Sequence, residues 1–166
     1  MPGGRYSRDL MAKPVGKAYE YALKALGRQE LTESQLAERL VRRGVEEDER
    51  AEVIDRLLAD GLLDDERFAR RYTEDKRELA GWGPERIREA LLARGVTRDL
   101  VEAALEGEGE TEQLRRAVAM LEDRGLRCDS DSERERALRL LVRRGYALEL
   151  AYEAVRVAER ASAEAA

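Results

Sequence analysis

Arginines at the ends of three leucine-rich segments, each stopped by a glycine, are the side chains of this sequence best suited to bind another molecule. They are Arg42, Arg43, Arg94, Arg143 and Arg144, and the glycines that follow are Gly44, Gly95 and Gly145. A guanidinium can form paired hydrogen bonds with a carboxylate or a phosphate. The same arginines also have a structural explanation, because cations near the carboxyl end of a helix offset its dipole by typically ~0.3–1 kcal/mol each. Both interpretations remain open.

Further candidate binding residues lie between the first and second of these sites. The cations are Lys76, Arg77, Arg86 and Arg88, and the aromatic side chain is Trp82. In stacked repeats the cations would line a ridge able to meet an acidic protein groove or nucleic-acid phosphates. Trp82, between two glycines, either fills a joint between helices or protrudes and stacks on a base, whereas Tyr72, four residues after Phe68, is expected in the core.

Catalytic chemistry has little support in this sequence. Histidine is absent and Cys128 is the single cysteine, which excludes an intrachain disulfide and a Cys/His zinc cluster. Asp64 and Asp65 are better explained as the start of a helix than as a paired-carboxylate site. We therefore expect no enzyme, no catalytic or metal-binding residue and no cofactor.

Composition and charge limit the class of protein further. Of the 166 residues 43% are hydrophobic and 40% are charged, which is typical of a folded, helix-rich protein. Neither a membrane span nor a signal peptide is recognisable, so we expect a cytoplasmic protein that does not enter a membrane. The formal net charge of −5 argues against DNA as the sole partner, although screening leaves room for a local basic strip.

The elements that carry these residues recur. The three glycines are spaced by about 50 residues, which marks tandem repeats. We predict an all-α fold of three tandem three-helix repeats, stacked into a curved, elongated array. The predicted segments are a flexible arm at 1–16, repeats at 17–61 and 62–106, and an acidic joint followed by the third repeat at 107–162.

Local signals place the helices within each repeat. Capping boxes are predicted at Thr32 with Gln35 and at Ser130 with Glu133, and Pro84 is expected in a first helical turn. Left-handed glycine caps are expected at the carboxyl ends. The side chains predicted to face the core include Leu36, Leu40, Val41, Ile54, Leu57, Leu58, Phe68, Leu79, Ile87, Leu91, Leu141 and Val142.

One segment of the sequence resembles a known family. LLDDERFARRYTEDKRELAGWGPERIREALLARGV, from Leu62 to Val96, is similar to the central part of the RecX regulatory family, and the flanking LGRQELTESQLAERLVRRG and ALRLLVRRGYALELAYEAV agree with it. The resemblance implies a bacterial, monomeric regulator that binds the RecA recombinase filament on single-stranded DNA. It implies restraint of recombination, ATP turnover and co-protease action, within DNA repair and the SOS response, by blocking filament extension or promoting disassembly.

Two other functions compete with this one. Each three-helix repeat could act like a helix-turn-helix and insert its arginine-tailed helix into a DNA groove, with weak direct binding to single- or double-stranded DNA. Alternatively, the array could be an adaptor that holds another protein. Binding to bare DNA, measured at two salt concentrations, separates the first of these from a filament regulator.

Overall fold

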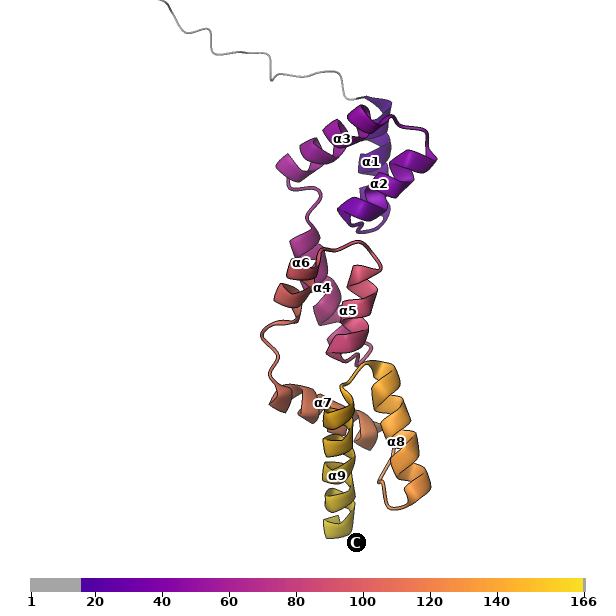
Figure 1. Ribbon diagram of the computed structural model, residues 1–166, viewed down its shortest axis with the longest axis vertical. Helices are drawn as coiled ribbons and strands as arrows, with labels where there is room; N and C mark the ends of the chain where they lie inside the picture. Colours follow the sequence, from indigo (N-terminus) through magenta and orange to yellow (C-terminus); the bar gives the residue numbers. More distant parts are fainter. Residues whose placement is uncertain (1–15, 166) are drawn as a thin grey trace, which may run out of the picture. The chain divides into compact units, whose positions relative to one another are not determined.

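The computed structural model describes residues 16–165, and within them every regular element is an α-helix (Figure 1). The helices are α1 (Lys17–Arg28), α2 (Glu33–Arg42), α3 (Glu47–Ala59), α4 (Asp65–Glu78), α5 (Pro84–Leu92), α6 (Arg98–Leu105), α7 (Glu110–Asp123), α8 (Asp131–Arg144) and α9 (Leu148–Ala165). The all-α prediction is confirmed for this part of the chain. Except for Gly16, the predicted arm lies outside the described residues.

Each consecutive set of three helices encloses its own hydrophobic core. We call α1–α3 repeat 1, α4–α6 repeat 2 and α7–α9 repeat 3. Leu36, Leu40 and Leu57 are fully buried in the core of repeat 1, Ile87 and Leu91 in that of repeat 2. Leu121, Ala137 and Leu141 are buried in the core of repeat 3. Small cores of this kind gain stability when neighbouring repeats also contact each other.

The repeats group into two compact units. Repeat 1 makes up one unit, which ends at Asp64, and repeats 2 and 3 together make up the other, which starts at Asp65. Repeats 2 and 3 are therefore joined more closely than a simple chain of independent domains would be. The residues at their junction are described with the candidate binding surface.

The arginine–glycine tails all end their helices in the same way. Gly44, Gly95 and Gly145 have φ angles of 78°, 79° and 89°, in the left-handed region. The residue after each glycine donates its N–H to the carbonyl of a leucine five residues earlier, at 3.1 to 3.2 Å. This is a Schellman motif, and it explains why a leucine, a glycine and an apolar residue recur at fixed spacing.

The amino ends of the helices follow local signals in most places. Thr32 and Gln35 form the predicted capping box, and Pro84 is the first residue of α5. At Ser130 the prediction is half wrong: the hydroxyl accepts the Glu133 N–H at 3.3 Å, but the Glu133 carboxylate accepts the N–H of Asp129 instead of Ser130. The Glu133 side chain therefore binds the residue before Ser130, and the reciprocal hydrogen bond that completes a capping box is missing.

Four residues predicted to face the core are exposed instead: Val41, Leu58, Leu79 and Val142, with exposed fractions of 54%, 36%, 84% and 46%. Leu79 lies one residue beyond the end of α4, so the helical periodicity no longer applies to it. The other three directly follow a buried leucine, and one residue turns a helix by about 100°. The apolar stripe facing each core is thus narrower than the sequence pattern suggests.

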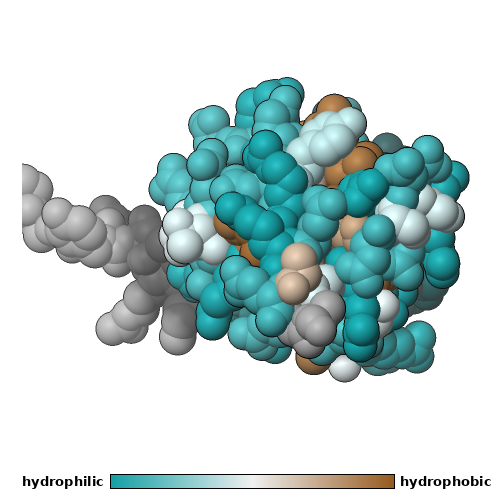
Figure 2. All heavy atoms as spheres, turned by 90° about the horizontal axis from the view of Figure 1, so that it is seen from below, coloured by the Kyte–Doolittle hydropathy of each residue, from teal (hydrophilic) through white to brown (hydrophobic). Residues whose placement is uncertain are grey.

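One face of the molecule is mainly polar. On the face drawn in Figure 2, hydrophilic residues cover most of the surface and small hydrophobic areas lie between them. None of the helices in residues 16–165 is long and apolar enough to span a bilayer.

Candidate partner-binding surface

The junction of repeats 2 and 3 joins two helices end to end. The carboxyl end of α8 meets the amino end of α5: the Gly83 N–H donates to the Arg144 carbonyl at 2.7 Å, and the Glu85 N–H donates to the Gly145 carbonyl at 3.0 Å. No side chain caps the start of α5. The free N–H groups of one helix therefore satisfy free carbonyls of the other, and the two dipoles meet with opposite ends.

Side chains reinforce this junction. Arg144 donates to the Ala80 carbonyl, Arg86 Nη1 donates to the Arg143 carbonyl at 3.0 Å, and the Tyr146 hydroxyl lies 3.4 Å from the Gly81 carbonyl. Two predicted binding residues, Arg86 and Arg144, thus hold repeats 2 and 3 together. The glycine break at residues 81–83 is the segment against which repeat 3 docks.

A buried ion-pair cluster lies beside the junction, at the acidic joint. Arg116 Nη2 donates to Glu108 Oε2 at 2.8 Å, and Arg77 Nε lies 3.0 Å from the same oxygen. Arg77 also donates to the Leu105 carbonyl at 2.9 Å. Burial lowers the pKa of Arg77, and the Glu108 carboxylate acts in the opposite direction. The Glu108 side chain is only 7% exposed, so this part of the predicted acidic joint is fixed by its contacts.

Arg88 is engaged inside repeat 2. Its Nε and Nη2 donate to the two carboxylate oxygens of Glu102 at 2.8 and 3.1 Å, which ties α5 to α6. Arg88 Nη1 also lies 2.7 Å from Glu85. The hydrogen bonds with Glu102 raise the pKa of Arg88, and those with Arg88 lower the pKa of Glu102. Because two carboxylates already neutralise the Arg88 guanidinium, it is poorly suited to bind a partner molecule.

Cations and rings alternate on repeat 2 in what we call the cation–aromatic cluster. Its members are Arg94, Tyr72, Lys76, Trp82 and Arg86. The Arg94 guanidinium lies 4.7 Å from the Tyr72 ring centroid, Lys76 Nζ lies 5.2 and 5.1 Å from the centroids of Tyr72 and Trp82, and Arg86 lies 4.1 Å from Trp82. These are cation–π distances. Trp82 is half-buried with its faces occupied by cations, and Tyr72 stacks on Phe68.

The arginine tail of repeat 1 is more exposed. Arg42 pairs with Glu38 at 3.1 Å, with 75% of the Arg42 side chain accessible. The Arg43 guanidinium lies 4.3 Å from the centroid of the Tyr21 ring. Exposed pairs of this kind contribute little to stability, so both guanidinium groups remain able to exchange partners.

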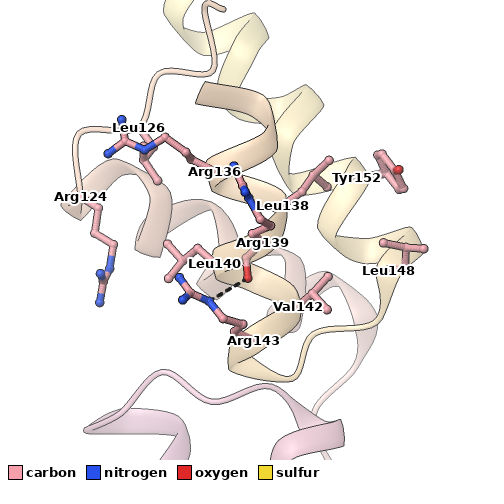
Figure 3. Close-up of a pocket in the computed structure, with 10 residues that line it drawn as sticks. All are labelled: Arg124, Leu126, Arg136, Leu138, Arg139, Leu140, Val142, Arg143, Leu148 and Tyr152. Carbon is pink, nitrogen blue, oxygen red and sulfur yellow. Dashed lines mark hydrogen bonds between the residues drawn. The ribbon is translucent and has the colours of Figure 1, made fainter. Parts of the chain in front are cut away.

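Repeat 3 carries an open groove that the sequence pattern did not reveal. Figure 3 shows α8 at its centre, with the end of α7 on one side and the start of α9 on the other. It holds about 930 Å³ and is lined by Arg124, Leu126, Arg136, Leu138, Arg139, Leu140, Val142, Arg143, Leu148 and Tyr152. Arg143 is the one predicted binding residue in this groove. The signal that could have indicated it is the apolar residues of α8 and α9 left outside the core stripe.

The ten predicted binding residues therefore occupy different environments. Arg42 and Arg43 are exposed on repeat 1, and Lys76, Trp82 and Arg94 belong to the cation–aromatic cluster. Arg77, Arg86, Arg88 and Arg144 make contacts within the second unit, and Arg143 lines the groove. Among the described residues no group of His, Cys, Asp and Glu is arranged to hold a metal ion.

Comparison with known proteins gives the family. Residues 18–57 match the family model of the first three-helix domain of RecX, and residues 64–105 match that of the second. The regulatory protein RecX of Mycobacterium ulcerans is 35% identical over 152 residues, which cover 88% of this chain and 86% of the relative. This chain belongs to the RecX family. The RecX of Mycolicibacterium smegmatis is 30% identical over 164 residues, covering 95% of this chain and 87% of that protein.

Solved RecX structures share the fold. The crystal structure of RecX from Lactobacillus salivarius superposes with a TM-score of 0.78 at 22% identity, over 87% of this chain and 96% of that one. A second RecX crystal structure gives a TM-score of 0.71 at 23% identity, over 85% of this chain and 70% of the other. The fold is thus shared at 22 to 23% identity.

Proposed function

We propose that this RecX-family chain regulates a RecA recombinase. In this proposal it binds the recombinase filament on single-stranded DNA and inhibits recombination, ATP hydrolysis and co-protease activity, by blocking filament extension or promoting disassembly. The observation that carries the proposal is the similarity to proteins named regulatory protein RecX, at 30 to 35% identity over most of both chains. The chain acts by binding, without catalysis or a cofactor, as a cytoplasmic monomer.

The construction of the second unit supports a role in binding a polymer. Repeats 2 and 3 are joined by main-chain hydrogen bonds between α8 and α5, not by a loose linker alone. Two repeats held in fixed register can contact two sites on a partner with little further loss of conformational freedom. A filament offers such sites at regular intervals, so a small regulator can act on a large assembly.

Three exposed and two half-buried cations are the docking residues in this proposal. Arg42 and Arg43 of repeat 1, Arg143 of repeat 3, and Lys76 and Arg94 of the cation–aromatic cluster meet acidic groups of the filament. Trp82 and Arg86 belong to the same cluster, and both Lys76 and Arg86 lie over the Trp82 ring. Arg77, Arg88 and Arg144 act indirectly. The hydrogen bonds of Arg77 and Arg88 hold helices of repeat 2 together, and that of Arg144 holds repeat 3 against repeat 2.

Co-sedimentation tests the binding step. Filaments of the cognate recombinase are assembled on single-stranded DNA with a nonhydrolysable ATP analogue and pelleted with the chain. We expect the chain in the pellet only when filaments are present, and in the supernatant with bare DNA or with recombinase alone. Equal recovery with and without filaments would contradict the proposal.

Direct DNA binding by a helix-turn-helix mechanism is the alternative. It requires the arginine-tailed ends of the second helices to enter a DNA groove. In repeat 3 that end is α8, where Arg144 donates to the Ala80 carbonyl and the last carbonyls accept N–H groups of α5. The arginine tail of α8 already makes hydrogen bonds within the second unit, which favours the filament proposal. Gel-shift measurements on bare duplex at two salt concentrations test the alternative, because phosphate contacts make binding strongly salt-dependent.

A further inference from the structure

The groove on repeat 3 combines exposed apolar side chains with a group of arginines. Three large apolar side chains, Val142, Leu148 and Tyr152, are 46%, 51% and 51% exposed along it. Four arginines, Arg124, Arg136, Arg139 and Arg143, also line it, and no acidic residue does. An apolar patch with polar residues at its edge is typical of a protein-binding site.

These arginines are poorly neutralised by the chain itself. Among the described residues neither Arg124 nor Arg136 has a carboxylate within ion-pair distance, and Arg143 donates to the carbonyl of Arg139 on its own helix (Figure 3). Arg139 is 3.6 Å from Glu135, and both side chains are about 70% exposed. In a chain with 36 acidic and 31 basic residues, four arginines along a groove that no acidic residue lines make a local positive site.

We infer that this groove binds an acidic, amphipathic helix of a partner protein. The apolar side chains would receive the apolar face of that helix, at positions i, i+3, i+4 and i+7, while its Asp and Glu residues pair with the arginines. Aliphatic side chains such as Val142 and Leu148 offer nothing to phosphates or stacked bases, which favours a protein over a nucleic acid. Residues 1–15 of this chain do not fit, because they carry Arg5, Arg8 and Lys13 against a single acid, Asp9.

The inference does not depend on the recombinase and can be tested without it. A library of 16-residue peptides displayed on phage is selected on the full chain, and the consensus peptide is synthesised with a fluorescent label. We expect the consensus to place acidic residues on one helix face and Leu, Ile, Phe or Met on the other. A consensus without acidic residues would overturn the inference.

Variants locate the binding site by fluorescence anisotropy. The double variant Arg136→Glu/Arg139→Glu and the single variant Val142→Glu remove, respectively, the charge and the apolar contact. We expect each to raise the dissociation constant of the consensus peptide at least tenfold. The matched control is Arg156→Glu/Arg160→Glu, which makes the same charge change on exposed residues of α9 outside the groove. It should change the constant by less than about twofold, since rim charges far from a site contribute little.

Three results would contradict the inference. Peptide affinity that survives both groove variants would place the site elsewhere. Binding of a labelled oligo-dT strand that is lost in Arg136→Glu/Arg139→Glu but kept in Val142→Glu, with no selected peptide, would make this a nucleic-acid surface. Dimers in light scattering that Val142→Glu dissociates would make it a contact between copies of this chain. Circular dichroism spectra equal to those of the unmodified chain establish that each variant is folded.

Discussion

Gly83 and Gly145 approach each other so closely that neither position has room for a side chain. A Cβ atom on Gly83 would lie 2.4 Å from the Gly145 carbonyl oxygen, and one on Gly145 would lie 2.4 Å from the Cβ of Arg86. Contacts this short between backbone atoms cannot be relieved by rotating a side chain. The two glycines are what allows α8 to end directly on the start of α5.

Replacing Gly83 with alanine should therefore weaken the second unit. The main chains of the two repeats would have to move apart and lengthen the hydrogen bonds of Gly83 and Glu85. We expect the free energy of unfolding to fall by about 1–3 kcal/mol, as for other overpacked sites. Gly109→Ala is the control, because Gly109 also precedes a helix but has no neighbour within 4 Å. Urea unfolding that is equally affected by both substitutions would refute the packing argument.

The Glu108 cluster should be equally important to the same unit. In Glu108→Gln the two guanidinium groups of Arg77 and Arg116, 16% and 21% exposed, lose their shared carboxylate. Removing one partner of a largely buried ion pair costs about 2–3 kcal/mol after allowance for partial exposure. Thermal unfolding should show a clear decrease in the midpoint. Glu112→Gln, which breaks an exposed pair with Arg115, should leave the midpoint nearly unchanged.

The burial of Cys128 leads to a prediction of how stability changes at alkaline pH. Its thiol is fully buried, and burial raises its pKa above the ordinary value. The folded state thus favours the neutral thiol, so its contribution is complete below the pKa of the unfolded chain and is lost as the pH rises through the folded pKa. We expect urea unfolding to show falling stability above about pH 9, and a shallower fall in Cys128→Ala. Rapid reaction of the native thiol with Ellman's reagent at pH 8 would contradict its burial.

Reversing the charge of the exposed arginines Arg42 and Arg43 of repeat 1 tests their proposed docking role. Arg42→Glu/Arg43→Glu should reduce filament binding at least tenfold without loss of helicity, because both residues are exposed. Lys24→Glu/Arg28→Glu makes the same charge change on exposed residues of α1 and is the control. An equal loss of filament binding in both variants would show that the effect comes from net charge and not from Arg42 and Arg43.

The same test applied to Arg86 and Arg88 would give a different answer. Arg88 is held by Glu85 and Glu102, and Arg86 donates to the Arg143 carbonyl. Reversal of these two charges should lower the thermal midpoint and loosen the junction of repeats 2 and 3. A loss of filament binding in that variant would therefore report on structure as well as on contact. Its melting curve must be measured alongside its binding.

The features that sequence predicted are those governed by neighbours along the chain. The capping box at Thr32, the start of α5 at Pro84 and the left-handed glycines depend on residues a few positions apart. Each of these features is governed by the backbone N–H and carbonyl groups that the end of a helix leaves unpaired. Such local rules gave the helices and their boundaries.

What sequence could not predict depends on distant residues. In the sequence Arg144 is an ordinary charge at a helix end, yet it donates a hydrogen bond to the carbonyl of Ala80, 64 positions away. Glu108 lies in a glycine-rich acidic stretch that resembles a flexible joint, but two arginines from different helices converge on it. The exposure of Val142 likewise depends on how α9 packs beside α8. Local patterns contain no information about such contacts, so the groove and the junction became visible only in the folded chain.

Hydrolysis of ATP by the cognate RecA recombinase on single-stranded DNA tests the central proposal most directly. The chain is added in increasing amounts to filaments at steady state, and the rate is followed with time. The proposal predicts a progressive decline in turnover, beginning well below one chain per recombinase subunit if filament extension is blocked. An unchanged rate at stoichiometric addition, with the chain shown to be folded, would contradict it.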